Sequence, residues 1–180
     1  MNDQGQTFDE RIIQVRRVSK KTKGGSRMGF STVVVVGDNH GRVGIGHGKA
    51  PDVSSAIRKA SSYAKRHMID VVMRGSTIPH DVDVKFGAAR VLLKPAPKGT
   101  GVIAGGPVRA VLEVAGVKDV VSKIMGTTNQ GLNVKAVFSA LTKLRNTKLT
   151  GLSDVRKAKL RKDVGIKDDG GSALAQMFED

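Results

Sequence analysis

Four consecutive valines at residues 33–36 follow a segment that carries only positive charge, and this combination limits what the chain can fold into. β-Branched runs are typical of strands. Every charged side chain from residue 11 to residue 37 is Lys or Arg, and Gly24 and Gly25 divide the segment. We expect strands at residues 8–18 and 30–36, joined by a basic loop at residues 19–28. Cations gathered at a hairpin end repel one another unless an anion binds them, so the segment indicates a polyanionic partner.

The composition supports an acidic polymer as that partner. The chain has 180 residues, with 31 Lys and Arg against 16 Asp and Glu, and a formal net charge of +15. Aromatic residues make up only 3 %, which favours contacts to the phosphates and sugars of a folded RNA over base stacking. No apolar run approaches the roughly 18 residues that span a bilayer, and the polar start is not typical of a signal peptide. We therefore expect a cytoplasmic protein that does not contact membranes.

The remainder of the first half predicts a third strand and a helix. Residues 42–49 alternate Val, Ile and His with Gly44, Gly46 and Gly48, so one face of this strand lacks side chains. That face suits close approach of another backbone, either a helix of the same domain or an RNA strand. Asp52 is suited to cap a helix whose apolar residues recur at helical spacing from residue 53 onward.

The second half predicts the element order β-β-α-β-α. Two strands flank a turn at Phe86 and Gly87, a helix begins at Pro107 and ends at Gly116, a strand covers residues 117–125, and a helix begins near Asn133. A weakly amphipathic basic helix is predicted at about residues 153–163. We expect a flexible N-terminus at residues 1–8, domains at residues 9–75 and 76–148, and a C-terminal tail at residues 149–180.

The glycine-rich stretch at residues 99–107 imitates a phosphate-binding loop without its essential residues. Gly101 and Gly106 have the required spacing, but Pro107 and Val108 stand where Lys and then Ser or Thr are needed. We expect this stretch to serve packing rather than nucleotide binding. The four histidines match no metal-ligand spacing, there is no cysteine, and no serine lies in a nucleophile elbow. The sequence indicates a binding protein that is not an enzyme and has no cofactor.

Several motifs resemble one known family in order along the chain. They are KGGSR at residues 23–27, VVVVGD at 33–38, GRVG at 41–44, GHGKA at 46–50, FGAARVLLKPA at 86–96 and GTGVIAGG at 99–106. These residues resemble small-subunit ribosomal protein S5 of the bacterial type, the uS5 family, over about residues 8–145. The resemblance implies an α+β fold with two domains. The first would be similar to a double-stranded-RNA-binding fold, a three-stranded sheet with one helix, and the second a split β-α-β sheet with two helices.

The resemblance also implies a function and partners. The chain would be a structural constituent of the small ribosomal subunit that binds and braces 16S-type ribosomal RNA between head and body and supports translational accuracy. Its neighbours would be ribosomal proteins S4 and S8 and the path by which messenger RNA enters, and it would not be a homo-oligomer. Alternatives are a subunit of an RNA-processing ribonucleoprotein and a protein that coats duplex RNA.

Two sets of candidate site residues follow from the charge pattern and the resemblance. The expected RNA-binding residues are Arg16, Arg17, Lys20, Lys21, Lys23, Gly24, Gly25, Arg27, Arg42 and Lys49. The expected interface with S4 and S8 comprises Gly101, Gly105, Gly106 and Arg109.

Overall fold

The computed structural model of the chain describes residues 8–145. These residues belong to one compact unit and form two four-stranded sheets and three helices, which confirms the predicted α+β class. The predicted C-terminal tail, with its basic helix at residues 153–163, and the N-terminal segment up to residue 7 lie outside the described residues. Within residues 8–145, no helix is both long and apolar enough to cross a membrane.

The first sheet is antiparallel and carries one helix. Its strands are β1 (Asp9–Thr22), β2 (Gly25–Gly37), β3 (Arg42–Ala50) and β4 (Met68–Asp70), in that order across the sheet. Helix α1 (Val53–Arg66) begins as predicted, because the Asp52 carboxylate accepts a hydrogen bond of 3.2 Å from the Ser55 backbone N–H. Strand β4 is an addition to the three expected strands. It has only three residues, too few for an alternating pattern to show.

The glycines of β3 explain how closely α1 approaches the sheet. A Cβ atom at Gly44, Gly46 or Gly48 would meet the backbone carbonyl oxygen of Ala64, Ala60 or Ala56, respectively. These three alanines lie on one face of α1, one turn apart. Of the two interpretations of the glycine face, packing within the domain is confirmed.

The second sheet is mixed and has the order β5-β6-β8-β7. Its strands are β5 (Val82–Phe86), β6 (Ala89–Pro95), β7 (Val102–Ile103) and β8 (Val120–Met125), and its helices are α2 (Gly106–Ala115) and α3 (Gln130–Lys143). Helix α2 has Pro107 in its first turn and ends at Gly116 in the left-handed conformation, as predicted. The two-residue strand β7, parallel to β8, was not predicted. Helix α3 begins at Gln130, earlier than the prediction near Asn133, because Asn129 caps it.

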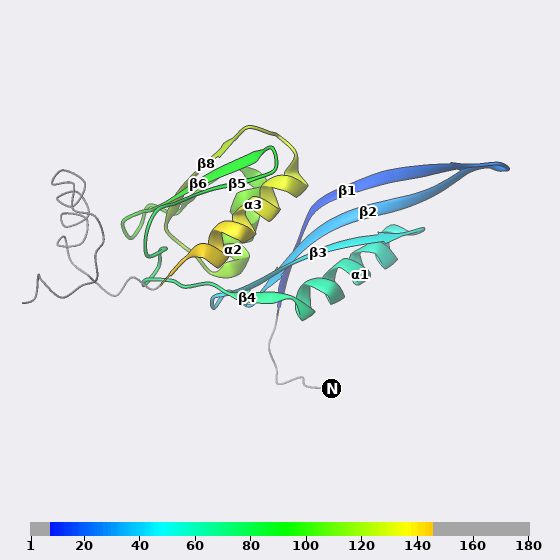
Figure 1. Cartoon of the computed structure of the whole chain (residues 1–180). Coiled ribbons are helices and arrows are strands. Elements are labelled where there is room, and N and C mark those ends of the chain that lie inside the picture. Colours follow the sequence, from blue (N-terminus) through cyan, green and yellow to red (C-terminus); the bar gives the residue numbers. More distant parts are fainter. Residues whose placement is uncertain (1–7, 146–180) are drawn as a thin grey trace, which may run out of the picture. The chain divides into compact units, whose positions relative to one another are not determined.

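Helices α2 and α3 contact both sheets, so the first sheet is covered on both faces near its base (Figure 1). Val34 and Val36 pack against α1, whereas Val35 packs into the larger core that contains the buried residues of α2 and α3. A run of consecutive valines is expected where both faces of a sheet are buried. The turn after β2 is joined to α2 by hydrogen bonds from Asn39 N–H to the Val114 carbonyl (3.1 Å) and from Gly41 N–H to the Ala115 carbonyl (3.0 Å).

Candidate nucleic-acid interface

The basic segment is the paired end of a long hairpin arm, and the predicted loop at residues 19–28 is wrong. Strands β1 and β2 remain paired from Asp9 opposite Gly37 to Thr22 opposite Gly25, with one shift of register between Ile12 and Gln14, so only Lys23 and Gly24 form the turn (Figure 1). Glycines and charges suggested a loop, but the ladder of hydrogen bonds between the strands continues through them. Residues 15–28 are all exposed, and partial burial begins at Gly29.

The register assigns each cation to one face of the arm. Opposite residues of an antiparallel pair share a face, and residues two apart along a strand share it as well. Val34 and Val36 face α1, so the other face contains the alternate positions of β2, including Ser31 and Arg27. This opposite face, which we call the cation face, carries Arg16, Lys20, Arg27 and Lys49. Arg17 and Lys21 lie on the face of α1, opposite Phe30 and Ser26, respectively.

Among the described residues, the cations between residues 16 and 27 of the arm form no ion pair with an acidic side chain. The five ion pairs found within residues 8–145 use Arg11, Arg42, Lys65, Arg90 and Arg109, and none of them uses a cation between residues 16 and 27. Lys20 lies directly opposite Arg27 on the cation face. Like charges placed directly opposite each other destabilise a strand pair, so an anion bound at this row would stabilise it.

The base of the cation face contains two residues that the sequence did not identify as part of a site. His47 lies in β3 next to Ser31 of β2, and its Nε2 atom is 2.8 Å from the Ser31 hydroxyl oxygen. The pKa of His47 lies below its ordinary value. The main cause is burial of the ring, and the positive charges of Lys49 and Lys135 add to it. Lys135 comes from α3, far away in sequence. The only sequence signal for Lys135 as a site residue is its position on the charged side of a helix.

Arg42 and Lys49 occupy opposite ends of β3, so the structure does not bring Arg42 together with the arm. Arg42 Nε donates to Asp38 Oδ2 at 2.8 Å, and Arg42 N–H donates to Asp38 Oδ1 at 2.9 Å. Burial by itself raises the pKa of Asp38, but these hydrogen bonds outweigh it and hold the pKa below its ordinary value. Arg42 therefore helps to shape the turn after β2.

The glycine-rich stretch binds a carboxylate of the same chain. The N–H groups of Gly99 and Gly101 each donate to Asp119 Oδ1 at 3.0 Å, and Asp119 is buried. The pKa of Asp119 is lowered mainly by a hydrogen bond from the Ser76 hydroxyl and, to a smaller extent, by the hydrogen bonds from these two backbone N–H groups. Because the fold itself uses these N–H groups, they are not free to bind a phosphate. This agrees with the packing role predicted for the stretch.

The remaining residues of the expected protein interface lie at the beginning of α2. Gly105 caps the helix without a side-chain hydrogen bond, and Gly106 is its first residue. Arg109 is exposed and donates from Nε to Glu113 Oε1 at 2.7 Å, one turn further along the helix. In residues 8–145 there is no group of three or more His, Cys, Asp or Glu side chains that could hold a metal ion.

The fold and the cation face define a class of protein: a basic α+β scaffold whose hairpin arm carries cations that, within residues 8–145, form no ion pair and suit a polyanion. The chain matches the family described as ribosomal protein S5, N-terminal domain, over residues 8–72. It matches ribosomal protein S5, C-terminal domain, over residues 84–158. The chain belongs to the ribosomal protein S5 family, a structural family rather than one of enzymes.

Individual relatives agree with this assignment. The small ribosomal subunit protein uS5 of Persephonella marina is 49 % identical over 162 residues, which cover 89 % of this chain and 84 % of that protein. The protein of the same name from Dehalococcoides mccartyi is 52 % identical over 143 residues, 79 % of this chain and 83 % of the relative. The one from Roseobacter denitrificans is 46 % identical over 178 residues, 98 % of this chain and 92 % of the relative.

Proposed function

We propose that this chain is a structural component of the small ribosomal subunit in the cytoplasm, where it braces 16S-type ribosomal RNA between head and body by neutralising phosphates. The observation that carries the proposal is the cation face, on which four side chains from three adjacent strands point the same way and form no ion pair with any acidic residue that the structure describes. Lys23, Gly24 and Gly25 extend this surface to the tip of the arm. The names of the relatives, small ribosomal subunit protein uS5, support ribosomal RNA as the polyanion.

A second part of the proposal concerns protein neighbours. We assign the exposed beginning of α2, with Gly105, Gly106 and Arg109, to the contact with ribosomal proteins S4 and S8. Gly101, the fourth residue of the expected interface, immediately precedes β7 and donates its N–H to Asp119. A location beside the path of messenger RNA and a contribution to decoding accuracy belong to the same proposal. Replacing Arg109 by Glu would then change stop-codon readthrough in a reporter assay, and unchanged readthrough would argue against this part.

The RNA-binding proposal is tested by the dependence of affinity on salt. If the four residues of the cation face each neutralise one phosphate, log K falls with log salt with a slope of about −3 to −4. Lys20→Ala/Arg27→Ala removes two of these contacts and should reduce the steepness by roughly 1.4 to 1.8. Arg17→Ala/Lys21→Ala removes the same charge from the opposite face and is the matched control, for which we expect a smaller change. Binding of ribosomal RNA fragments is measured by filter retention.

Two results would contradict the proposal. Equal effects of the two double variants would show that net charge, and not the cation face, governs binding. A wild-type chain that does not sediment with small subunits after a high-salt wash would show that it is not a stable component of the particle.

A further inference from the structure

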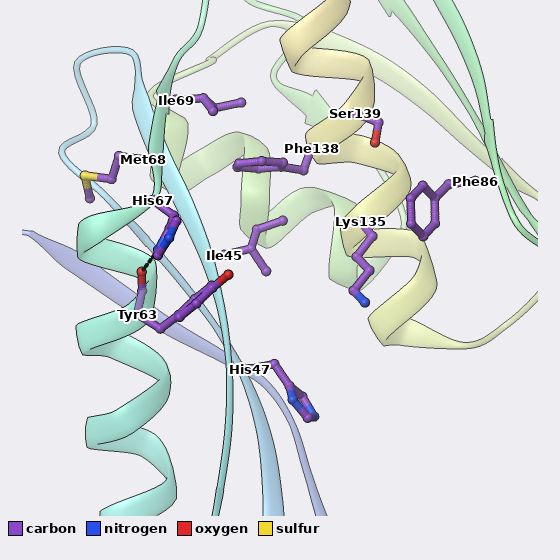
Figure 2. A pocket seen from close by; sticks show the side chains of 10 residues that line it. All are labelled: Ile45, His47, Tyr63, His67, Met68, Ile69, Phe86, Lys135, Phe138 and Ser139. Carbon is purple, nitrogen blue, oxygen red and sulfur yellow. Dashed lines mark hydrogen bonds between the residues drawn. The ribbon is translucent and has the colours of Figure 1, made fainter.

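A large groove between α1 and α3 holds half of the chain's few aromatic residues. It has a volume of about 750 Å³, within the range of about 300–1,000 Å³ that small-molecule sites occupy. The chain has five Phe and one Tyr, and three of these six, Tyr63, Phe86 and Phe138, line the groove. They come from α1, the end of β5 and α3, so only the folded chain brings them together (Figure 2).

Two of these rings are open to solvent. Tyr63 is 46 % exposed and Phe86 is 39 % exposed. The Tyr63 ring stacks on His67, with ring centroids 4.1 Å apart and an angle of 19° between the planes. His67 is held in place, because its Nδ1 atom donates to the Tyr63 carbonyl at 2.9 Å. The pair forms a fixed flat platform at one wall of the groove (Figure 2).

The groove is continuous with the cation face. His47 and Lys135 line it, and they also line an adjoining hollow together with Arg16 and Ser31 of the cation face. Figure 2 shows the ammonium group of Lys135 on the side of the groove toward His47. A ligand that combines a flat apolar ring with a phosphate matches this arrangement, since the ring can stack and the phosphate can meet Lys135.

We propose that the groove receives an unpaired nucleobase of the RNA that the arm binds, stacked against the exposed part of the Tyr63 ring, with its phosphate toward Lys135. The inference rests on the proposed function and adds a site to it. Bases inside a duplex are not accessible to such a groove, so the nucleotide must come from a loop, bulge or single strand. The groove therefore gives this RNA-binding scaffold a way to select a site at which a base is turned out.

The intrinsic fluorescence of Tyr63 provides a direct test, because the chain has one tyrosine and no tryptophan. The purified full chain is titrated with a short oligoriboadenylate and, at the same salt concentration, with a fully paired duplex of equal length. We expect the single strand to quench the fluorescence through stacking on Tyr63, and the duplex to leave it nearly unchanged.

A leucine variant tests the contribution of the aromatic ring, because it keeps an apolar side chain at the same position. Tyr63→Leu removes the ring on which the base would stack and should weaken binding of the single strand about 5-fold or more, measured by filter retention, since one base stack on an aromatic ring contributes about 1–3 kcal/mol. The salt slope should not change, because no cation is lost. Phe8→Leu is the matched control. Phe8 does not line the groove; it packs on the core that contains Ala60 and Ala64, with Lys65 Nζ 5.7 Å from its ring centroid, and its loss should not affect binding.

The outcomes also separate this inference from the proposed function. Unquenched Tyr63 with intact, arm-dependent RNA binding would overturn the base site and leave the phosphate contacts standing. The groove would then suit an apolar segment of a protein partner. If neither RNA binds and the arm variants have no effect, the proposed function fails and the base site fails with it.

Discussion

Replacing Gly46 by Ala should separate α1 from the first sheet. A Cβ atom at this position would meet the Ala60 carbonyl oxygen, and it would lie 2.6 Å from the Ala60 carbonyl carbon and 3.1 Å from the Ala64 nitrogen. These are backbone atoms of a helix, so no side-chain rotation relieves the overlap. Restoring ordinary contact at 3.4 Å or more requires α1 to move outward, which also loosens its packing on Val34 and Val36.

Overpacking of a core costs about 1–3 kcal/mol, and the rigid neighbours here favour the upper end. We expect Gly46→Ala to lower the free energy of unfolding by about 3 kcal/mol. At roughly 2–4 °C per kcal/mol for a chain of this size, the melting temperature should fall by roughly 6–12 °C. Far-UV circular dichroism of the full chain, with thermal and urea unfolding, measures both quantities.

Gly24→Ala is the control for this experiment. Nothing lies within 4 Å of a Cβ atom at Gly24, so we expect its stability to stay within about 1 kcal/mol of the wild type. A Gly46→Ala variant that melted within about 2 °C of the wild type would refute the argument, because a loss of about 3 kcal/mol cannot produce so small a shift.

Three further predictions concern other contacts. Gly116→Ala should lower the melting temperature, because residue 116 has φ +89° and its Cβ would meet the Asn39 carbonyl oxygen at the joint between α2 and the first sheet. The pKa of Asp119 is lower in the folded chain than its ordinary value of 3.8, so the unfolded chain binds the proton first and stability falls as the pH drops through this range. Asp119→Asn should reduce stability at neutral pH and flatten that decline, as measured by urea unfolding at several pH values. Lys135→Met should raise the pKa of His47 by removing a nearby positive charge, and NMR titration of the ring protons checks this.

Local patterns in the sequence predicted most of the elements and their ends. The Asp52 cap, the limits of α2 at Pro107 and Gly116, and the packing role of the β3 glycines all depend on neighbours in sequence or on backbone geometry. The short strands β4 and β7 could not be predicted, because two or three residues carry no periodicity. The domain boundary near residue 75 stays a prediction.

The sequence could not show how distant residues meet at the candidate sites. Low aromatic content argued against stacking, yet three rings from three separate elements converge on one groove. Similarly, Lys135 joins His47 only because α3 packs beside β3, a contact that no local pattern encodes. The sequence also could not show which residues share a face of the arm. That depends on a bulge between Ile12 and Gln14, which shifts the register of every residue beyond it.

This register gives a test that keeps composition and charge constant. Exchanging two residues of the arm, Lys20→Ser with Ser26→Lys, moves one cation from the cation face to the face of α1 without changing the net charge. If the cation face contacts the phosphates, the exchange should reduce the steepness of the salt dependence by about 0.7 to 0.9, the share of one phosphate. The fold should be retained, because both positions are exposed and the valine base that holds the two strands is untouched. Salt titrations of the exchanged and native chains with the same ribosomal RNA fragment make the comparison, and identical slopes would mean that the number of cations matters but their face does not.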